Sequence, residues 1–438
     1  MSELFNIQDT TANKISYYHL LLFMASLPFD MFYSHIILIS YAIHTLINLN
    51  KTSLKRLYDR RILILQSVFL VTLLSTIYTI KPHEAFQAWG GQITIFLIPI
   101  VFYLSPFDVK KYRPQLLMGF ALVCTATIAY LFIDALITIK HYHLPFITLF
   151  SGAFTNHNFS EPINMHATFF SMQVVIALVY LLSILVKETG RYKKLFYLLC
   201  CTVLLAGIIQ LSSKSIFVVL AVVINVAFPY FLSTGKKRVQ FIITSITLTM
   251  LIAGGITFSG NLRERYITSL TDDLSKSVPR QTTDTRLARW QVTYGLIKRS
   301  PVIGYGAGSE IGLLQDGFYQ HKLYNSYLNK LNTHSEYLSF LLKSGIIGLL
   351  IYLGTLVYGF RAALRRRDIF FFTFMLLITV VSLSENLLDV DKGIIFYTFF
   401  FAFFISDNIK QPVDNQTIKV KEYLEPVATN QVAVASYL

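Results

Sequence analysis

Charged residues are scarce in this 438-residue chain. Asp, Glu, Lys and Arg make up 14% of it, whereas hydrophobic residues make up 54%. Soluble domains contain about 25% charged residues and roughly 45–50% apolar residues. The composition therefore lacks the polar surface that a soluble protein of this length needs, which excludes a cytosolic globular enzyme, a disordered protein and a fibrous protein.

Cysteine is scarce as well. Cys124, Cys200 and Cys201 lie in apolar segments and form no C-x-x-C pair, so we expect neither a disulfide framework nor a thiol nucleophile. A small-residue cleavage site is missing after the first apolar run, and residues 1–13 are polar. We therefore expect that run to be a retained helix and not a cleavable signal peptide.

Acidic residues are outnumbered by basic ones, 24 against 38, which gives a formal charge of +14. In a soluble protein this excess would suggest a nucleic-acid partner. In an apolar chain, the positions of the basic residues decide what the excess means.

Long hydrophobic runs, in contrast, are abundant. A helix needs about 20 mostly apolar residues to cross the hydrocarbon core of a membrane. Twelve segments approach this requirement: 15–32, 34–49, 62–80, 85–104, 115–139, 164–186, 194–212, 215–232, 239–258, 336–360, 369–385 and 390–406. The sequence predicts an all-α polytopic membrane protein with about 12 transmembrane helices, built as a single membrane-embedded domain over residues 1–438.

Most basic residues lie in alternate connections between these segments. If the N-terminus is cytoplasmic, the short outer loops hold only Lys81, Lys140, Lys214 and Lys392. Basic residues favour the cytoplasmic side, so we expect both termini there and no nucleic-acid partner. Residues 407–438 are polar and lack periodicity, which predicts a disordered cytoplasmic tail.

One long loop, residues 259–335, separates the ninth and tenth segments and is predicted to face outward. It is rich in basic residues, among them Arg280, Arg286 and Arg289. Individually these could be ordinary solvated side chains, because long loops cross membranes largely regardless of charge. As a set they form a basic surface beside the membrane that suits an anionic or lipid-diphosphate ligand.

Residues 284–299 of this loop show a helical pattern, with Asp284 as the expected N-cap. Apolar residues recur at spacings of three, four and three: Leu287, Trp290, Tyr294 and Ile297. Arg286 and Arg289 share a face away from this stripe. An Arg pair near a helix N-terminus can bind phosphate bidentately, and a solvated surface is the alternative for both residues.

Two short motifs follow this helix. In P-V-I-G-Y-G-A-G, residues 301–308, the glycines imitate a dinucleotide fingerprint, but no strand precedes them, so we interpret them as backbone turns. His334 lies at the outer membrane boundary, where it could be a general base or a hydrogen-bonded interfacial residue. No partner stands at H-E-x-x-H-type spacing, so we expect no metal site.

The order of these features resembles the O-antigen ligase and O-antigen polymerase superfamily of bacterial polytopic glycan ligases. The resemblance is carried by D-x-R-x-x-x-W (Asp284, Arg286, Trp290), by P-x-x-G-x-G-x-G (residues 301–308) and by H-S-x-x-L from His334, followed by Gly345. It implies an inner-membrane protein whose large loop, carrying short helices, and whose active site both face the periplasm.

The resemblance also implies a substrate pair, with a glycan on undecaprenyl diphosphate as donor and lipid A core as acceptor. By similarity, His334 would activate the acceptor hydroxyl and Arg286 would bind the diphosphate. Lys214, in L-S-S-K-S, stands where the family usually has an arginine, and lysine keeps the charge but loses the bidentate geometry. No cofactor is expected, and the remaining partners are membrane lipids.

Further residues are expected near the same site. Arg289 or Arg280 could add positive charge against the leaving diphosphate. His166 could line the acceptor side or be a packed interfacial histidine. An acidic turn between the last two segments could pair with the basic loop or face water; it contains Glu385, Asp389 and Asp391.

Other functions remain open at this stage. An O-antigen polymerase or a protein O-oligosaccharyltransferase would use the same donor and a different acceptor. A lipid-linked glycan transporter would also suit twelve spans. A six-plus-six transporter, however, predicts its long connection near the middle of the chain, where this sequence has a short one.

Overall fold

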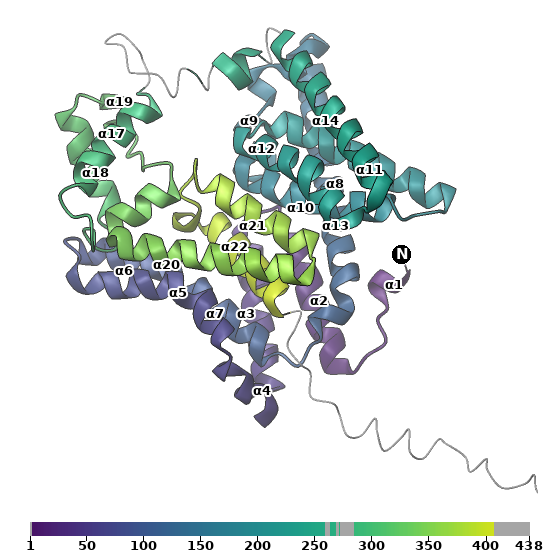
Figure 1. The fold of residues 1–438 in the computed structure, drawn as a ribbon, viewed down its shortest axis with the longest axis horizontal. Coiled ribbons are helices and arrows are strands. Elements are labelled where there is room, and N and C mark those ends of the chain that lie inside the picture. The colour runs from purple at the N-terminus through teal and green to yellow at the C-terminus, as the bar shows by residue number, and fades with distance from the viewer. Residues whose placement is uncertain (1, 259–262, 269–270, 272–283, 407–438) are drawn as a thin grey trace, which may run out of the picture.

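The computed structural model describes residues 2–258, 263–268, 271 and 284–406, and every regular element in these ranges is a helix (Figure 1). The predicted all-α fold class is therefore confirmed. The predicted tail, residues 407–438, and Arg280 of the long loop lie outside the described residues.

Seven helices in the described part of the chain are long and apolar enough to cross a membrane. They are Arg60–Tyr78 (α5, Arg60–Ser75, and the turn after it), Pro82–Leu104 (α6, Pro82–Gly91, and α7, Ile93–Leu104), Val109–His141 (α8), Ala167–Leu185 (α10), Arg191–Leu211 (α11), Lys214–Leu232 (including α12, Lys214–Val222, and α13, Phe228–Leu232) and Glu336–Arg366 (α20). An eighth results if α3 (Met31–Ile47) is joined to Lys51–Tyr58, which is bent from it by 112° and begins with α4 (Lys51–Lys55).

Each of the twelve predicted apolar segments coincides with a helix, but some of these helices are short. α2 (Thr11–Ser26) and α22 (Asp391–Ser406) have 16 residues each, and α21 (Ile369–Val381) has 13. α14 (Gly235–Phe258) is longer and is not among the seven. The structure supports seven or eight candidate spans, and the count of twelve stays a prediction.

α10 lies at the centre of the helices, where nearly all of its side chains are buried. It packs against α8, α11, α21 and α22. α21 and α22 contribute a cluster of phenylalanine rings to this centre: Phe371, Phe374, Phe396, Phe400, Phe401 and Phe404. Burial of such rings provides a large hydrophobic stabilisation, so this centre is a rigid support for what its helix ends carry.

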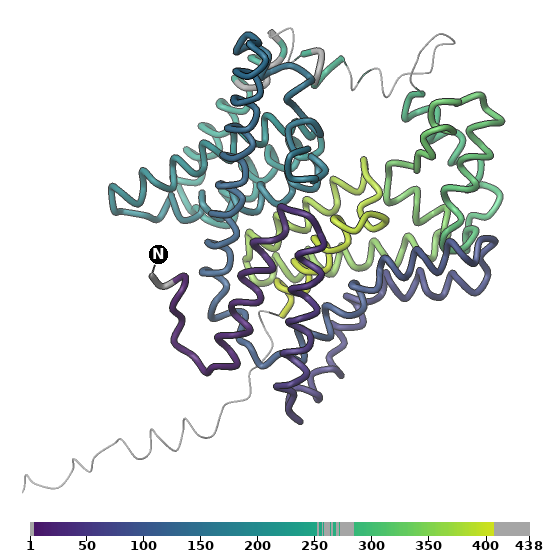
Figure 2. Tube along the Cα trace, turned by 180° about the vertical axis from the view of Figure 1, so that it is seen from behind, coloured from purple at the N-terminus to yellow at the C-terminus, as the bar shows by residue number. Residues whose placement is uncertain are grey.

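Two groups of helices flank the centre, as both views show (Figures 1 and 2). One contains α8, α11, α12 and α14, and the other contains α5, α6 and α7. The predicted long loop adds α17 (Arg286–Ile297), α18 (Glu310–Gln320) and α19 (Tyr324–Leu328). α18 packs against both α17 and α19, and α17 and α18 also pack against α20. Figure 1 shows these three helices on the same side of the molecule as α6. Short helices α1 (Ser2–Phe5) and α9 (His157–Ser160) occupy connections.

Candidate active site

Arg286 occupies the first position of α17. The N-cap of this helix is Thr285, whose hydroxyl accepts a hydrogen bond from the backbone N of Ala288 at 3.3 Å. The prediction that Asp284 is the N-cap is wrong. Its carboxylate instead accepts a hydrogen bond from the backbone N of Ser326 at 2.7 Å. Asp284 thus fastens the start of α17 to α19, which fixes where Arg286 enters the site.

Arg289 shares a face with Arg286, as predicted, but that face is packed. Arg289 is buried together with Val292, whereas Tyr294 of the predicted apolar stripe is exposed. α17 packs against α18 and α20, and Val292 lies in an apolar cluster with residues of both helices. The alternative of a solvated surface is therefore excluded for Arg289.

His334 lies in the short loop before α20. Its backbone is left-handed, with φ of 48°, a conformation that residues other than glycine adopt infrequently. The side-chain oxygen of Asn332 accepts a hydrogen bond from the backbone N of His334 at 3.0 Å. Trp290 Nε1 donates to the carbonyl of Thr333 at 2.8 Å. The helix that carries Arg286 therefore also holds the loop that carries His334.

Asn386 fixes the two residues that flank His334. Its Oδ1 accepts hydrogen bonds from Thr333 Oγ1 at 3.0 Å and from Ser335 N at 2.9 Å. Its Nδ2 donates to Glu310 Oε1 at 2.9 Å. These groups are buried, so each polar atom needs such a partner in place of water. Sequence analysis missed Asn386, because its partners lie far away in the chain.

Glu385, in the turn after α21, faces His334. Its Oε2 lies 3.8 Å from His334 Nδ1, and the two side chains are 18% and 28% exposed. Nearby, Arg286 Nη1 donates to the carbonyl of Ser384 at 3.3 Å. Burial raises the pKa of Glu385, but the nearby side chains of His334, His166 and Arg286 lower it overall. The acidic turn therefore pairs with the basic loop through Glu385, which is ionised at neutral pH.

His166 lies just before α10 and interacts electrostatically with Glu385. Its ring centroid is 4.1 Å from that of His157, whose Nδ1 accepts a hydrogen bond from Ala167 N at 3.4 Å. Burial lowers the pKa of His166 to about 4, against a smaller opposing effect of Glu385. His166 is therefore neutral near pH 7, and among the described residues nothing bonds its buried Nδ1.

Lys214 is the first residue of α12. It follows a tight turn in which Ser212 is left-handed, with φ of 56°. Ser213 Oγ donates to Thr168 Oγ1 at 3.4 Å. Because Thr168 stands two residues after His166, the turn that carries Lys214 packs against the end of α10 that carries His166. The structure thus brings His334, Arg286 and His166 together near Glu385, and the turn before Lys214 packs against the start of α10.

Lys343 of α20 lies behind the loop of His334. Its Nζ is 2.7 Å from Asp389 Oδ1 and 3.8 Å from Glu310 Oε2. Ser339 Oγ donates to Glu310 Oε2 at 2.5 Å. Since Asn386 also bonds Glu310 and Asp389, one ionic network joins α18, α20 and the turn after α21. This network braces the loop before α20.

The glycines of residues 301–308 form backbone turns, as predicted. Gly304, Gly306 and Gly308 have φ of 69°, 91° and 74°. Gly306 N donates to the carbonyl of Lys343 at 2.8 Å, and a Cβ on Gly306 would overlap the backbone of Thr79. The segment is therefore a packed connector between α20 and the residues after α5.

Gly345 breaks α20. Its φ of 61° and ψ of −163° belong to a region that essentially only glycine adopts. The backbone N of Ile346 donates to the carbonyl of Pro301 at 2.9 Å, and a Cβ on Gly345 would overlap the carbonyl of Val302. The backbone of residues 301–302 thus packs directly against α20 at the break, where a side chain on residue 345 would not fit.

A cavity of about 820 Å³ adjoins the loop of His334 on the side of α5 to α7. Most of its lining is apolar, and the hydrogen-bonding side chains among the lining residues include Gln87, Gln92, Glu310, Asn332 and Asp389. Asn332 connects this cavity to the site, because it also bonds the backbone of His334.

The groups that meet at this site are acid–base and anion-binding groups: imidazole, carboxylate, guanidinium and ammonium. In the described ranges, no three His, Cys, Asp or Glu side chains are arranged to hold a metal ion. Residues 167–353 match the family model described as O-Antigen ligase. Residues 167–353 are therefore similar to the O-antigen ligase family.

The match confirms the resemblance to the O-antigen ligase superfamily. The family supports a bacterial membrane enzyme of the ligase or polymerase type that acts on lipid-linked glycans. Lys214, Arg286 and His334 lie inside the matched range, whereas Glu385 and Asn386 lie beyond its end. No curated protein matches the chain significantly.

Proposed function

We propose that this protein transfers a glycan from undecaprenyl diphosphate to the lipid A core, at the periplasmic face of the bacterial inner membrane. The observation that supports this most directly is the pairing of His334 with Glu385 at 3.8 Å, beside Arg286. A base next to cations is what the attack of a hydroxyl on a glycosyl diphosphate needs.

His334 is the general base in this proposal. Its Nδ1 faces the Glu385 carboxylate, which favours a proton on Nδ1 and leaves Nε2 to accept the proton of the acceptor hydroxyl. Glu385 also stabilises the imidazolium that forms. Hydrogen bonds at catalytic sites are often long before substrate binds, so 3.8 Å suits a pair that tightens in the complex.

The diphosphate leaves as the new bond forms. The acceptor oxygen bonds the anomeric carbon, the bond from that carbon to the diphosphate oxygen breaks, and the electron pair stays on the diphosphate. Arg286 and Lys214 stabilise this charge, with Arg289 and Arg280 as further contributors. A direct displacement without a metal or cofactor inverts the anomeric centre, and a product with retained configuration would contradict it.

The acceptor occupies the cavity beside Asn332. Its amide and carboxylate lining suits the hydroxyl groups of a core oligosaccharide. His166, being neutral, serves the acceptor side as a hydrogen-bonding group and does not act as a cation for the diphosphate.

The orientation is part of the same proposal: twelve spans, both termini cytoplasmic, and the loop 259–335 in the periplasm. It is supported by the positions of the charges, because His166, His334 and Lys214, all predicted outer, lie at one end of the central helices. Some of the basic residues predicted to be cytoplasmic line one pocket at the other ends of α10 and α20: Lys110, Arg113, Lys187, Arg366 and Arg367.

The decisive experiment incubates the purified protein with a polyprenyl-diphosphate glycan and, separately, with lipid A core, a second glycan or a protein acceptor. Product with lipid A core alone supports the ligase. Product with a glycan or a protein alone would identify a polymerase or a protein O-oligosaccharyltransferase. Absence of transfer, together with movement of the intact lipid across vesicles, would identify a transporter.

A further inference from the structure

Three central helices have one end at the candidate active site and the other end at a second pocket. α10 runs from His166 toward Lys187, α20 runs from His334 to Arg366, and α21 runs from Asp368 toward Glu385. With 19 residues and a rise of about 1.5 Å per residue, α10 is about 28 Å long, close to the thickness of a hydrocarbon core. The second pocket therefore lies at the opposite membrane surface.

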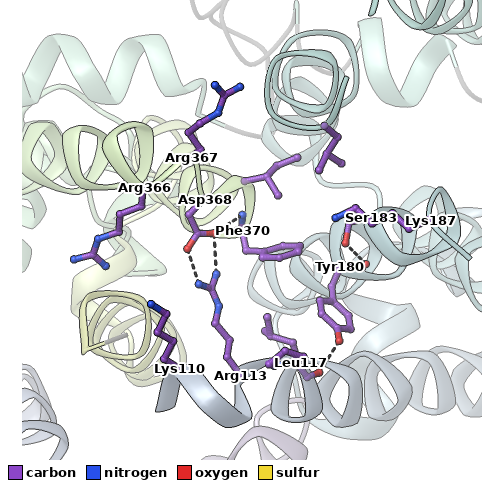
Figure 3. Close-up of a pocket in the computed structure, with 13 residues that line it drawn as sticks. Lys110, Arg113, Leu117, Tyr180, Ser183, Lys187, Arg366, Arg367, Asp368 and Phe370 are labelled. Carbon is purple, nitrogen blue, oxygen red and sulfur yellow. Dashed lines mark hydrogen bonds and ion pairs between the residues drawn. The ribbon is translucent and has the colours of Figure 1, made fainter. Parts of the chain in front are cut away.

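This pocket has a volume of about 600 Å³ and is strongly basic. Five basic residues and one acidic residue line it, which leaves a formal excess of four positive charges: Lys110, Arg113, Lys187, Arg366 and Arg367, against Asp368. Figure 3 shows Lys110, Arg366 and Arg367 around the Arg113–Asp368 pair, with Lys187 on the far side of Tyr180.

Asp368 does not neutralise the other cations. Its Oδ2 is 2.7 Å from Arg113 Nη1 and its Oδ1 accepts from Arg113 Nη2 at 2.8 Å (Figure 3). The same carboxylate caps α21 by accepting from the backbone N of Phe370 and of Phe371, at 3.0 and 3.1 Å. Its charge is thus already shared between one arginine and a helix N-terminus.

Arg367 is held in an unusual backbone conformation. It is the C-cap of α20 in the left-handed region, with φ of 51°, where glycine is the favoured residue. Its Nη2 donates to the carbonyl of Tyr230 at 3.4 Å, across to α13. Unfavourable backbone conformations tend to occur where the side chain has a use.

Apolar side chains from α8, α13 and α21 also line the pocket: Pro114, Leu117, Leu232, Ile369 and Phe370. Basic and apolar side chains side by side in a pocket at a membrane surface suit a lipid with an anionic headgroup.

We propose that this pocket binds an anionic phospholipid. The headgroup phosphate lies among Lys110, Lys187 and Arg367, and an acyl chain lies along Leu117 and Leu232. This site is separate from the proposed donor and acceptor sites, which lie at the other ends of the same helices.

The test is retention of phosphatidylglycerol by the purified full chain, measured by native mass spectrometry in detergent. The triple variant Lys110→Gln, Lys187→Gln, Arg367→Gln is compared with Lys193→Gln, Lys194→Gln, Arg365→Gln. The control removes the same charge from exposed residues that do not line the pocket. We expect a loss of affinity of roughly tenfold to a hundredfold in the pocket variant alone, since each basic residue near the surface strengthens binding to anionic lipid.

Three further arms separate the possible occupants. Phosphatidylcholine and inorganic phosphate are expected to bind at least about tenfold more weakly than phosphatidylglycerol. Residues 407–438 follow α22, and Arg366 of the pocket donates a hydrogen bond to the carbonyl of Phe404 in that helix. Removal of residues 407–438 is expected to leave lipid retention unchanged. Equal retention by the two triple variants, equal binding of inorganic phosphate, or a gain on removing the tail would each overturn the proposal.

Discussion

Nδ1 of His334 and Oε2 of Glu385 lie 3.8 Å apart, although all of α20 and α21 separate the two residues in the chain. The loop of His334 and the turn of Glu385 are joined by Asn386, which bonds Thr333 and Ser335. The pair is therefore set by a buried hydrogen-bond network and not by two flexible surface side chains.

The pair predicts a specific pattern of lost activity. We expect His334→Ala to lower kcat by at least about a hundredfold, the usual contribution of a general base. Glu385→Gln, which keeps the shape and removes the charge, is expected to lower kcat about tenfold or more with an unchanged KM for the donor. Steady-state kinetics on purified, folded protein measure both.

The double variant distinguishes a joint role from two separate ones. If Glu385 acts through His334, His334→Ala with Glu385→Gln is no slower than His334→Ala alone. Effects that multiply, or near-normal turnover of His334→Ala, would contradict this assignment. Glu188→Gln, at the other end of α10, provides the control and is expected to be neutral.

The cations predict changes in donor binding. Lys214→Arg is expected to retain activity, because the charge is kept and a bidentate contact becomes possible. Arg286→Gln is expected to raise KM for the donor and lower kcat, each about tenfold, because charge against the leaving diphosphate is lost. Lys140→Gln, in a short connection predicted to be outer, is the matched control. Complete loss in Lys214→Arg would give Lys214 a different role.

His166 predicts a pH dependence of stability. Burial lowers its pKa to about 4, from an ordinary value of 6.5, in surroundings that include His157, Glu385, His334 and Lys392. Above pH 6.5 the imidazole is neutral in both the folded and the unfolded protein. As pH falls from 6.5 toward 4, the unfolded chain binds a proton that the folded protein does not, so stability decreases.

We therefore expect His166→Gln to flatten the fall in the thermal unfolding midpoint between pH 6.5 and 5. His143→Gln, at an exposed histidine, is expected to keep the wild-type profile. Parallel profiles for wild type and His166→Gln would show that the buried state of His166 does not limit acid stability.

The break at Gly345 leads to a prediction about stability. Gly345→Ala is expected to cost about 1–3 kcal/mol, because alanine avoids this backbone conformation and its Cβ meets the carbonyl of Val302. Gly354→Ala, in the same helix with open space around it, is expected to be neutral or slightly stabilising. Thermal unfolding in detergent measures both, and equal midpoints would contradict the argument.

Sequence periodicity located the apolar helices and α17, because an apolar run has few alternatives to a helix, but it did not locate α18 and α19. It could not fix the number of spans, since α2, α21 and α22 are shorter than the apolar runs predicted at their positions. For the site, motif order identified His334, Arg286 and Lys214. His166 and Glu385 remained open between a functional and a surface role, because that choice depends on tertiary burial.

Other features depend on contacts that no local pattern encodes. Arg289 has the spacing of a surface arginine, yet it is buried. Asn386 has no motif of its own and becomes important only through partners on α18 and before α20. Asp284 looks like a helix cap, but a nearby backbone N–H on α19 competes for its carboxylate.

The break at Gly345 divides α20 into two mechanical parts. The short part, from Glu336 to Ser344, is tied to the glycine segment and follows the loop of His334, whereas the long part crosses toward Arg366. A membrane helix responds to a thicker or thinner bilayer by changing its tilt. The glycine segment bonds both parts of α20, through Tyr305 N to the carbonyl of Leu342 before the break and through the carbonyl of Pro301 to Ile346 N after it. A change in tilt of the long part therefore acts directly on residues 301–306, the segment that also contacts the short part below the loop of His334.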